Sequence, residues 1–370
     1  MARSRASQIE PPSPSALGYR MPAEWEPHAA TWLAWPHNKT DWPGKFDSIP
    51  WVFADIIRNL ARVEEVNLIV ASAREKQTAK EVLRRSHVDM RRVKFHLWPT
   101  NRIWTRDSGP IFVKNERWVK NERSVAITNW RFNAWAKYPD WKHDNQLPSR
   151  IAKKLKLQEF TPVVERDGKP YHVVLEGGSI DVNGQGLMVT TEECHLSKIQ
   201  QRNPGLTQGE LEQVFAVYLG VEKVIWLGGG IQGDDTHGHV DDISRFVAAE
   251  TVLTAVEPRR GDANYEPLKE NLRRLRAATD LEGRRLQIVE LPLPRPVIFR
   301  GQRLPASYAN FYIANGLVLV PTFNDPSDRI ALNILAGLFP GREIVGIHCG
   351  DFIWGLGAIH CMTQQQPAAE

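Results

Sequence analysis

Two kinds of hydrophobic spacing alternate along the chain. Segments 48–65 and 72–86 have helical spacing, and the first begins with Ser48 as a candidate N-cap, so both are predicted to be amphipathic helices. The apolar runs at 66–72 and 91–99 are typical of strands. Further helices are predicted at 144–156, 207–219, 264–279 and 328–338. Because helices and strands alternate, the pattern indicates an α/β fold.

Five glycine-containing strand segments indicate a weak internal repeat, at 104–113, 175–190, 238–255, 306–321 and 356–363. Each segment contains one polar residue that could be equivalent to those in the others: Asp107, Glu176, Asp241, Asn310 and Cys361. Their successive separations are 69, 65, 69 and 51 residues. These intervals favour about five copies of one mixed α/β unit, which would close into a ring with the polar residues at its axis. The alternative is chance spacing in a two-domain protein.

The chain shows no interdomain linker. Residues 1–17 are rich in Arg, Ser and Pro without periodicity, so we expect a flexible tail there. A charged segment at 114–125 is expected to connect two strands, and a proline-rich loop is expected at 292–305. We therefore expect a single catalytic domain over residues 18–370.

Composition narrows the class of protein. Of 370 residues, 42% are hydrophobic and 24% charged, as in globular proteins. The net charge of +4 is too small to argue for a nucleic acid or a membrane surface as partner. The apolar runs are shorter than the ~18 residues that span a bilayer. With no apolar stretch near residue 1 and only three cysteines, we expect a cytoplasmic protein.

Cys361, in the segment GLGAIHCMTQQQP, is the first candidate for chemistry. A free thiol has a pKa of ~8.5, so a nucleophilic Cys361 needs a base or a cation beside it. On a strand the adjacent His360 would point to the opposite face, so this partner is expected from elsewhere. The alternative is a small buried residue, as we expect for Cys194 and Cys349.

The segment GGGIQGDDTHGHVDD (228–242) is the second candidate. It lacks both the Gly-Lys-Ser/Thr of a P-loop and the helix that follows a dinucleotide fingerprint. If it is a strand, His237, His239 and Asp241 project from one face, and Asp235 joins them. One interpretation is a metal site of the H-x-H-x-D kind. The others are an acid/base histidine beside a substrate-binding carboxylate, or a plain surface turn.

Two further carboxylates complete the set. Asp107 lies in WTRDSGP, where an ion pair with Arg106 is the structural alternative, and Glu176 lies in LEGGSI, where an edge charge is the alternative. A thiol, a histidine and three carboxylates suit covalent catalysis on a cationic carbon. Carboxylates bind a planar guanidinium bidentately, the thiolate adds to its carbon, and the histidine exchanges protons with the departing amine and with water.

Several long motifs resemble those of one known family. They include MPAEWEPHAATWLAWPHNKTDWPG, WTRDSGP, WRFNAWA, LEGGSIDVNG, GDDTHGHVDD, SYANFYIANG and IHCMTQQQP, and they cover about residues 19–367. The chain is similar to the agmatine deiminases and the related bacterial-type peptidylarginine deiminases. This resemblance implies the five-fold pseudosymmetric α/β propeller (pentein-type fold) of guanidino-group-modifying enzymes, which use neither a metal nor another cofactor.

The resemblance also implies a role for each candidate residue. Cys361 matches the nucleophile that forms an amidino-thioether, His239 matches the acid/base histidine, and Glu176 matches the glutamate near it. Asp107 and Asp241 match the carboxylates that bind the guanidinium.

Two further residues, and several differences from the family's motifs, concern how the substrate is bound. Trp104 is expected to be a wall of the cleft, and Asn310 matches a polar residue near the cysteine. Agmatine deiminases usually follow FNAW with Gly-Gly, where this chain has Ala136 and Lys137. Asp242 stands where plant-like members have Asn. These differences lie in loops that could select the tail of the substrate, so deiminase chemistry is better supported than agmatine itself.

The expected reaction is hydrolysis of agmatine to N-carbamoylputrescine and ammonia, a step of putrescine and polyamine metabolism. Free arginine or peptidylarginine would use the same site, and an amine in place of water would make the protein an amidinotransferase. Alternatives from other classes are a metal-dependent amidohydrolase built on His237, His239 and Asp241, and a non-catalytic binding module. The expected partner is a small guanidinium compound, and homo-oligomerisation is left open.

Overall fold

The computed structural model describes residues 13–118 and 124–369. Residues 1–12 of the expected tail, residues 119–123 of the charged segment and residue 370 lie outside this description. Residues 13–17, also expected in the tail, instead form turns against the body of the protein. The backbone N–H of Ser15 donates to the carbonyl of Val217 (3.1 Å), and Leu17 packs on an apolar cluster.

The predicted helices are present with trimmed ends. They are α1 (Ile49–Leu60), α2 (Ala73–Arg85), α4 (Leu147–Leu155), α6 (Gln208–Leu219), α7 (Tyr265–Ala277) and α8 (Pro326–Leu338), and the short α3 (Thr105–Ser108) and α5 (Glu192–Leu196) were not predicted. Ser48 precedes α1 but makes no side-chain cap, whereas Ser72 accepts from the backbone N–H of Glu75 at the start of α2. Asp325 and Asp328 form a capping box at α8.

Five sheets of the described chain share one connectivity. In each, a first strand pairs antiparallel with a second, and one or two helices lead to a third strand parallel to the second. Four of these sheets are β4 (Ile111–Lys114), β5 (Val125–Thr128) and β6 (Gln158–Phe160); β9 (Ile180–Val182), β10 (Leu187–Thr191) and β11 (Lys223–Leu227); β12 (Ser244–Ala248), β13 (Thr251–Val256) and β14 (Gln287–Pro292); and β17 (Tyr312–Ala314), β18 (Leu317–Thr322) and β19 (Glu343–His348).

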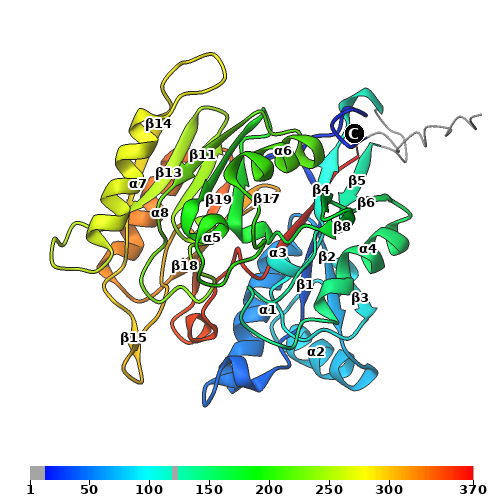
Figure 1. Ribbon diagram of the computed structural model, residues 1–370. Coiled ribbons are helices and arrows are strands. Elements are labelled where there is room, and N and C mark those ends of the chain that lie inside the picture. Colours follow the sequence, from blue (N-terminus) through cyan, green and yellow to red (C-terminus); the bar gives the residue numbers. More distant parts are fainter. Residues whose placement is uncertain (1–12, 119–123, 370) are drawn as a thin grey trace, which may run out of the picture.

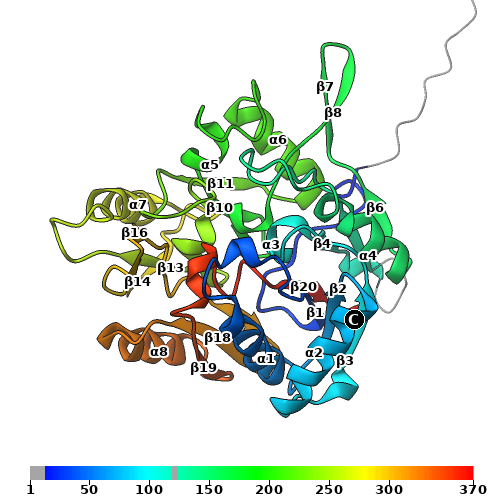
Figure 2. The same cartoon turned by 90° about the horizontal axis from the view of Figure 1, so that it is seen from below.

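The fifth sheet joins distant parts of the sequence. Its strands are β20 (Gln364–Pro367), β1 (His28–Ala34), β2 (Glu65–Val70) and β3 (Val93–Leu97), in that order. β20 pairs antiparallel with β1, with Thr31 opposite Gln365, and Figure 1 shows the red end of the chain beside this blue strand. Seen from below, α1, α2, α4, α6, α7 and α8 follow one another around the outside, and α3 lies in the middle (Figure 2).

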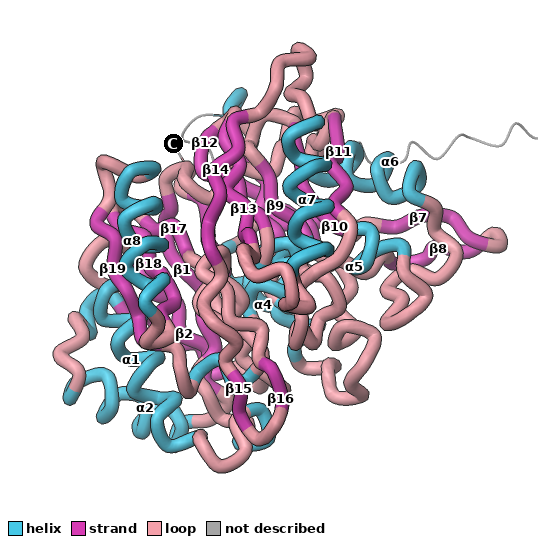
Figure 3. Tube along the Cα trace, turned by 90° about the vertical axis from the view of Figure 1, so that its left-hand side faces the viewer, coloured by secondary structure: helices cyan, strands magenta, loops and turns pink. Residues whose placement is uncertain are grey.

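Two hairpins stand apart from these sheets. β7 (Val163–Arg166) pairs with β8 (Lys169–His172), and β15 (Ile298–Phe299) pairs with β16 (Gln302–Arg303). The second lies within the segment expected to be a proline-rich loop, and it projects from the body in Figure 3. None of the described helices combines the length and the apolar character that a membrane span requires.

The largest apolar cluster supports the middle of the molecule. Trp42 is fully buried, and its ring lies 5.9 Å from that of Trp104 and 5.6 Å from that of Phe352. A Cβ atom on Gly355 would come within 2.5 Å of the Trp42 ring, so the backbone here fits directly against the indole. This packing fixes Trp104, which leads into α3 and Asp107.

Candidate active site

The five polar residues of the expected repeat occupy the same place in their sheets. Each lies two to four residues before the first strand: β4, β9, β12, β17 or β20. All five side chains are buried, from 0% exposure for Glu176, Asp241 and Asn310 to 6% for Cys361. The contacts below show that they meet at one site, as the repeat predicted.

Cys361 lies at a cavity of about 300 Å³. Its Sγ accepts from Nδ2 of Asn310 at 3.1 Å and lies 3.7 Å from Oδ2 of Asp241. Trp104 and Asp107 also line the cavity. A Cβ on Gly357 would lie 2.7 Å from the Trp104 ring and 3.2 Å from Cβ of Cys361, so this glycine leaves the space between the indole and the thiol open.

Asp107 is held by two donors. Nε1 of Trp135 donates to Oδ2 (2.9 Å), and the backbone N–H of Gly178 donates to Oδ1 (3.0 Å). Burial, opposed by His239 and aided by Asp241, raises the pKa of Asp107 to about 6.

The alternative ion pair between Asp107 and Arg106 is absent. Arg106 points instead to Glu24 (3.2 Å) and to Oε1 of Gln365 (2.6 Å), and it supports the site from behind.

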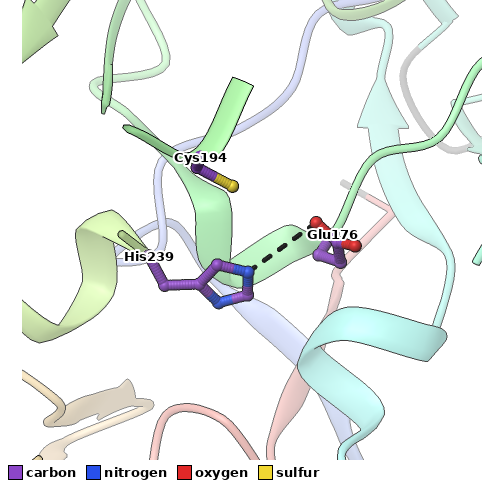
Figure 4. A group of neighbouring side chains, drawn as sticks. All are labelled: Glu176, Cys194 and His239. Carbon is purple, nitrogen blue, oxygen red and sulfur yellow. Dashed lines mark ion pairs between the residues drawn. The ribbon is translucent and has the colours of Figure 1, made fainter. Parts of the chain in front are cut away.

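His239 lies between two carboxylates. Its Nδ1 is 3.8 Å from Oδ1 of Asp107, and its Nε2 is 3.7 Å from Oε2 of Glu176 (Figure 4). Burial opposes the charged form, but Asp107, Cys194 and Glu176 raise the pKa of His239 well above its ordinary value. Both contacts are longer than hydrogen bonds, and neither ring nitrogen has a hydrogen-bond partner among the described residues.

Glu176 is fixed by a buried arginine. Nε of Arg202 lies 3.1 Å from its Oε1, and both side chains are fully buried. Burial alone would raise the pKa of Glu176, but Arg202 and His239 lower it to about 2. The structure therefore favours an ionised Glu176 beside the histidine.

The expected strand through His237 and His239 is wrong. The backbone turns at His237, where φ is 64°, and a 3₁₀ helix follows at Val240–Asp242. His237 therefore points away, with Nε2 3.0 Å from Oγ of Ser197, and Asp235 instead accepts from the Tyr138 hydroxyl (2.7 Å). The H-x-H-x-D metal set is not assembled among the described residues.

His360 was expected on the opposite face from the site, and this is also wrong. Residues 359–362 form a turn rather than a strand. Nδ1 of His360 lies 2.7 Å from Oδ2 of Asp241, and Nε2 lies 2.8 Å from Oε2 of Glu24. Burial would raise the pKa of Asp241, but His360 lowers it, so this carboxylate is ionised.

The surroundings of Cys361 disfavour its thiolate. Burial, followed by Asp241, Asp242 and Asp107, raises the pKa of Cys361 well above its ordinary value. Asp242, which accepts from Nδ2 of Asn310 (2.9 Å), has its own pKa raised by burial and by Asp241. A cation bound near these carboxylates would offset their effect and lower the pKa of Cys361.

One paired cation lines the cavity. Arg102 pairs with Asp41 and lies over the Tyr138 ring (4.3 Å). Asp235, which also lines the cavity, pairs with Lys137, which does not line it. The sequence pointed to Lys137 only as part of a loop that could select the substrate tail. It predicted neither Arg102 at the cavity nor Trp135 as a hydrogen-bond donor to Asp107. The signal available for Trp135 was its place in the FNAW motif.

Comparison with known proteins identifies the family. The model of the Porphyromonas-type peptidyl-arginine deiminases matches residues 20–367. A Legionella pneumophila (strain Philadelphia 1) protein named "Putative agmatine deiminase" is 36% identical over 96% of this chain and 97% of its own. The structure described as "Agmatine deiminase of Enterococcus faecalis catalyzing its reaction" has a TM-score of 0.87 at 31% identity, over 99% of this chain and 100% of its own.

A C. jejuni agmatine deiminase, a cysteine-to-serine variant with substrate bound, has a TM-score of 0.81 at 29% identity, over 95% of this chain and 97% of its own. The family model's match, at residues 20–367, spans every candidate residue named above. The protein belongs to the Porphyromonas-type peptidyl-arginine deiminase family.

Proposed function

We propose that this protein is a hydrolase of linear amidines that converts agmatine to N-carbamoylputrescine and ammonia. The observation that carries the proposal is the convergence of one thiol, one histidine and two carboxylates, namely Cys361, His239, Asp107 and Asp241, on a single small site. The family match and the agmatine deiminases among its structural relatives support the same chemistry.

The two carboxylates bind the guanidinium. Asp107 lines the cavity, and hydrogen bonds from Trp135 and Gly178 hold its carboxylate in place. Oδ1 of Asp241 is buried and has no hydrogen-bond partner among the described residues, so it is free to accept from a guanidinium N–H. A planar cation held between two fixed carboxylates presents its central carbon to Cys361.

Binding the cation also ionises the thiol. The guanidinium neutralises the carboxylates that raise the pKa of Cys361, and it places a positive charge near the sulfur. The thiol proton passes to solvent water as the cation binds, and it is taken up again after the product leaves. The thiolate then adds to the guanidinium carbon and forms a C–S bond. His239, held protonated by Asp107 and Glu176, gives its proton to one terminal nitrogen, and the C–N bond breaks to release ammonia.

Water completes the reaction. The amidino-thioether on Cys361 is attacked by a water molecule whose proton passes to the now neutral His239. The C–S bond breaks, the thiolate returns, and the product carries a carbamoyl group in place of the amidine. One water is consumed and one ammonia is released, so no further co-reactant is needed.

The wall of the cavity favours agmatine over free arginine. The lining contains one cation, Arg102, which is already paired with Asp41, and it also contains the carboxylates of Asp107 and Asp235. A substrate carboxylate would need an unpaired cation, whereas the ammonium of agmatine meets a wall in which carboxylates outnumber cations. Trp104 supplies an apolar surface beside the chain between the two charged ends.

We also propose that the fold is the pentein-type α/β propeller. Five sheets of one connectivity, each with a polar residue just before its first strand, support this arrangement. The peripheral helices seen from below agree with it (Figure 2).

Ammonia release from a panel of agmatine, free arginine, a peptidyl arginine and simple guanidines tests the function. Agmatine should give the highest kcat/KM, and a chelator should have no effect. Turnover of peptidyl arginine alone would overturn the substrate, and amidine transfer to an added amine in preference to water would overturn the hydrolase.

A further inference from the structure

The imidazole of His360 lies between two buried carboxylates. Its Nδ1 is 2.7 Å from Oδ2 of Asp241 and its Nε2 is 2.8 Å from Oε2 of Glu24. The ring is 1% exposed, so water does not take part in either contact. An ionised carboxylate only accepts hydrogen bonds, so two such neighbours require a donor at both ring nitrogens.

The charges around the ring fit this requirement. Glu24 is also paired with Arg245 (2.9 Å) and Arg106 (3.2 Å), and Arg245 is paired in turn with Asp181 (3.0 Å). With a doubly protonated His360, the buried cations and carboxylates of this network are equal in number: Arg106, Arg245 and His360 against Glu24, Asp181 and Asp241. A neutral ring would leave one buried negative charge uncompensated, which is costly.

The network also fixes the Asp241 carboxylate beside the thiol. His360 contacts Oδ2, the oxygen that lies 3.7 Å from Sγ of Cys361, and Oδ1 is buried without a hydrogen-bond partner among the described residues. The backbone N–H of His360 donates to Oδ1 of Asn310 (2.9 Å), whose Nδ2 contacts Sγ of Cys361. His360 thus contacts both Asp241, which binds the guanidinium, and Asn310, which contacts the nucleophile Cys361.

We propose that His360 is a positioning residue that acts as an imidazolium, locking Asp241 to Glu24 so that the Asp241 carboxylate is held beside the thiol, where it binds the guanidinium. The proposal rests on the guanidine deiminase function proposed above, but its spectroscopic test does not. It also gives a function to Glu24, whose segment MPAEWEP contributes no other group to the site. Ile313 donates its backbone N–H to Oε1 of Glu24 (2.8 Å), which fixes the far end of the network.

The protonation state can be measured directly. In the full chain labelled with ¹⁵N-histidine, the His360 ring, identified by its loss in His360→Asn, should show two protonated nitrogens at neutral pH without substrate. One bare nitrogen would overturn the proposal, because a carboxyl group would then hold the proton. Failure of agmatine turnover would leave this result intact and would count against the proposed function alone.

A double-mutant cycle tests the action through Asp241. His360→Asn should lower kcat/KM by about 10- to 100-fold, chiefly through KM, because a hydrogen bond to a charged group is lost. In an Asp241→Asn background the same change should cost less than about threefold, since there is no carboxylate left to orient. Equal losses in both backgrounds would show a merely structural role and overturn the proposal.

His96→Asn is the matched control. His96 is a buried histidine of β3 whose Nε2 contacts Oδ1 of Asn67 (2.8 Å), away from the site. This variant should lose stability with an unchanged KM. Glu24→Gln should reproduce the KM effect of His360→Asn, and a normal KM in Glu24→Gln would contradict the network.

Discussion

Gly178 lies so close to His239 that a Cβ atom there would be 2.7 Å from Nδ1 of the imidazole. The same atom would lie 2.8 Å from Oδ1 of Asp107 and 3.0 Å from Oδ2 of Asp241. Real Cβ atoms do not approach other atoms this closely, so the backbone at Gly178 fits the site only without a side chain. Gly178 is thus a spacer that lets the histidine and both carboxylates come together.

Gly178→Ala should lower kcat/KM by at least about 100-fold, because displacing the histidine or a carboxylate by a fraction of an ångström to an ångström is enough for such a loss. Gly337→Ala is the control. A Cβ on Gly337 meets nothing within 4 Å, and the residue lies in α8, so this change should raise stability slightly and leave turnover unchanged. Normal activity in Gly178→Ala would contradict the crowded geometry.

Cys361→Ala and Cys361→Ser should lose about 10³-fold or more in kcat and keep the fold, since covalent catalysis is removed. Circular dichroism checks the fold and ammonia release checks the rate. Cys349→Ala, at another fully buried cysteine that does not line the cavity, should cost stability but not turnover. Equal turnover by Cys361→Ser and the natural protein would disprove the nucleophile.

Asp107 predicts an acidic limb in the pH profile. Burial raises its pKa from 3.8 to about 6, so the charge that binds guanidinium is lost as the pH falls through 6. We expect log kcat/KM for agmatine to fall with a slope near one below pH 6. The limb should vanish from the residual activity of Asp107→Asn, and a limb that persists there would belong to another group.

The same shift predicts a change in stability. A carboxyl group whose pKa is raised by folding destabilises the folded state above its unfolded pKa, so this cost is present above about pH 6 and disappears toward pH 4. Asp107→Asn should therefore unfold at a higher temperature than the natural protein at pH 8. The difference should narrow or reverse at pH 4, and a constant difference would contradict the raised pKa.

Substrate-assisted ionisation of Cys361 can be followed by thiolate absorbance. Burial and three carboxylates raise the pKa of the thiol above its ordinary value. A simple unreactive guanidinium should lower the pKa of Cys361 when it binds, and Cys361→Ala should show no such change. An unchanged pKa would mean that the thiolate exists beforehand, as a standing pair with protonated His239.

Arg202 should be important for stability as well as for the site. Arg202→Gln leaves Glu176 charged and buried without its partner, and loss of one member of such a pair costs about 3–5 kcal/mol. Chemical denaturation measures the cost. Arg91→Gln, which removes an exposed pair with Asp89, should change the unfolding free energy by less than about 1 kcal/mol.

The repeat spacing located the site because each polar residue precedes the first strand of a sheet. A spacing of 65 to 69 residues fixes where a unit begins, and so it placed Asp107, Glu176 and Asp241 together without any knowledge of contacts. The prediction of local backbone conformation around these residues was less accurate than the prediction of their place in the repeat. Segments around His239 and Cys361 were predicted as strands, and both are turns.

The predicted strands led to two wrong placements. Because alternate residues of a strand share a face, they placed His237 on the same face as His239 and placed His360 on the face away from the site. A left-handed residue at His237 and a turn at 359–362 reverse both conclusions. Turns dominated by tertiary contacts follow no hydrophobic period, so the position of Glu24 against His360, across 336 residues, left no local signal in the sequence.

The pairing of β1 with β20 also bears on how the protein folds. Trp32 and Gln366 in these strands are hydrogen-bonded across a separation of 334 residues, and Cys361 lies three residues before β20. Contacts of such long range incur a large loop-closure entropy before they bring any stabilisation, so they form late. If the other four of the five similar sheets form first, Cys361 is not yet in its position at the site. During refolding from denaturant, recovery of turnover should therefore follow the slowest step, well behind the recovery of helical signal.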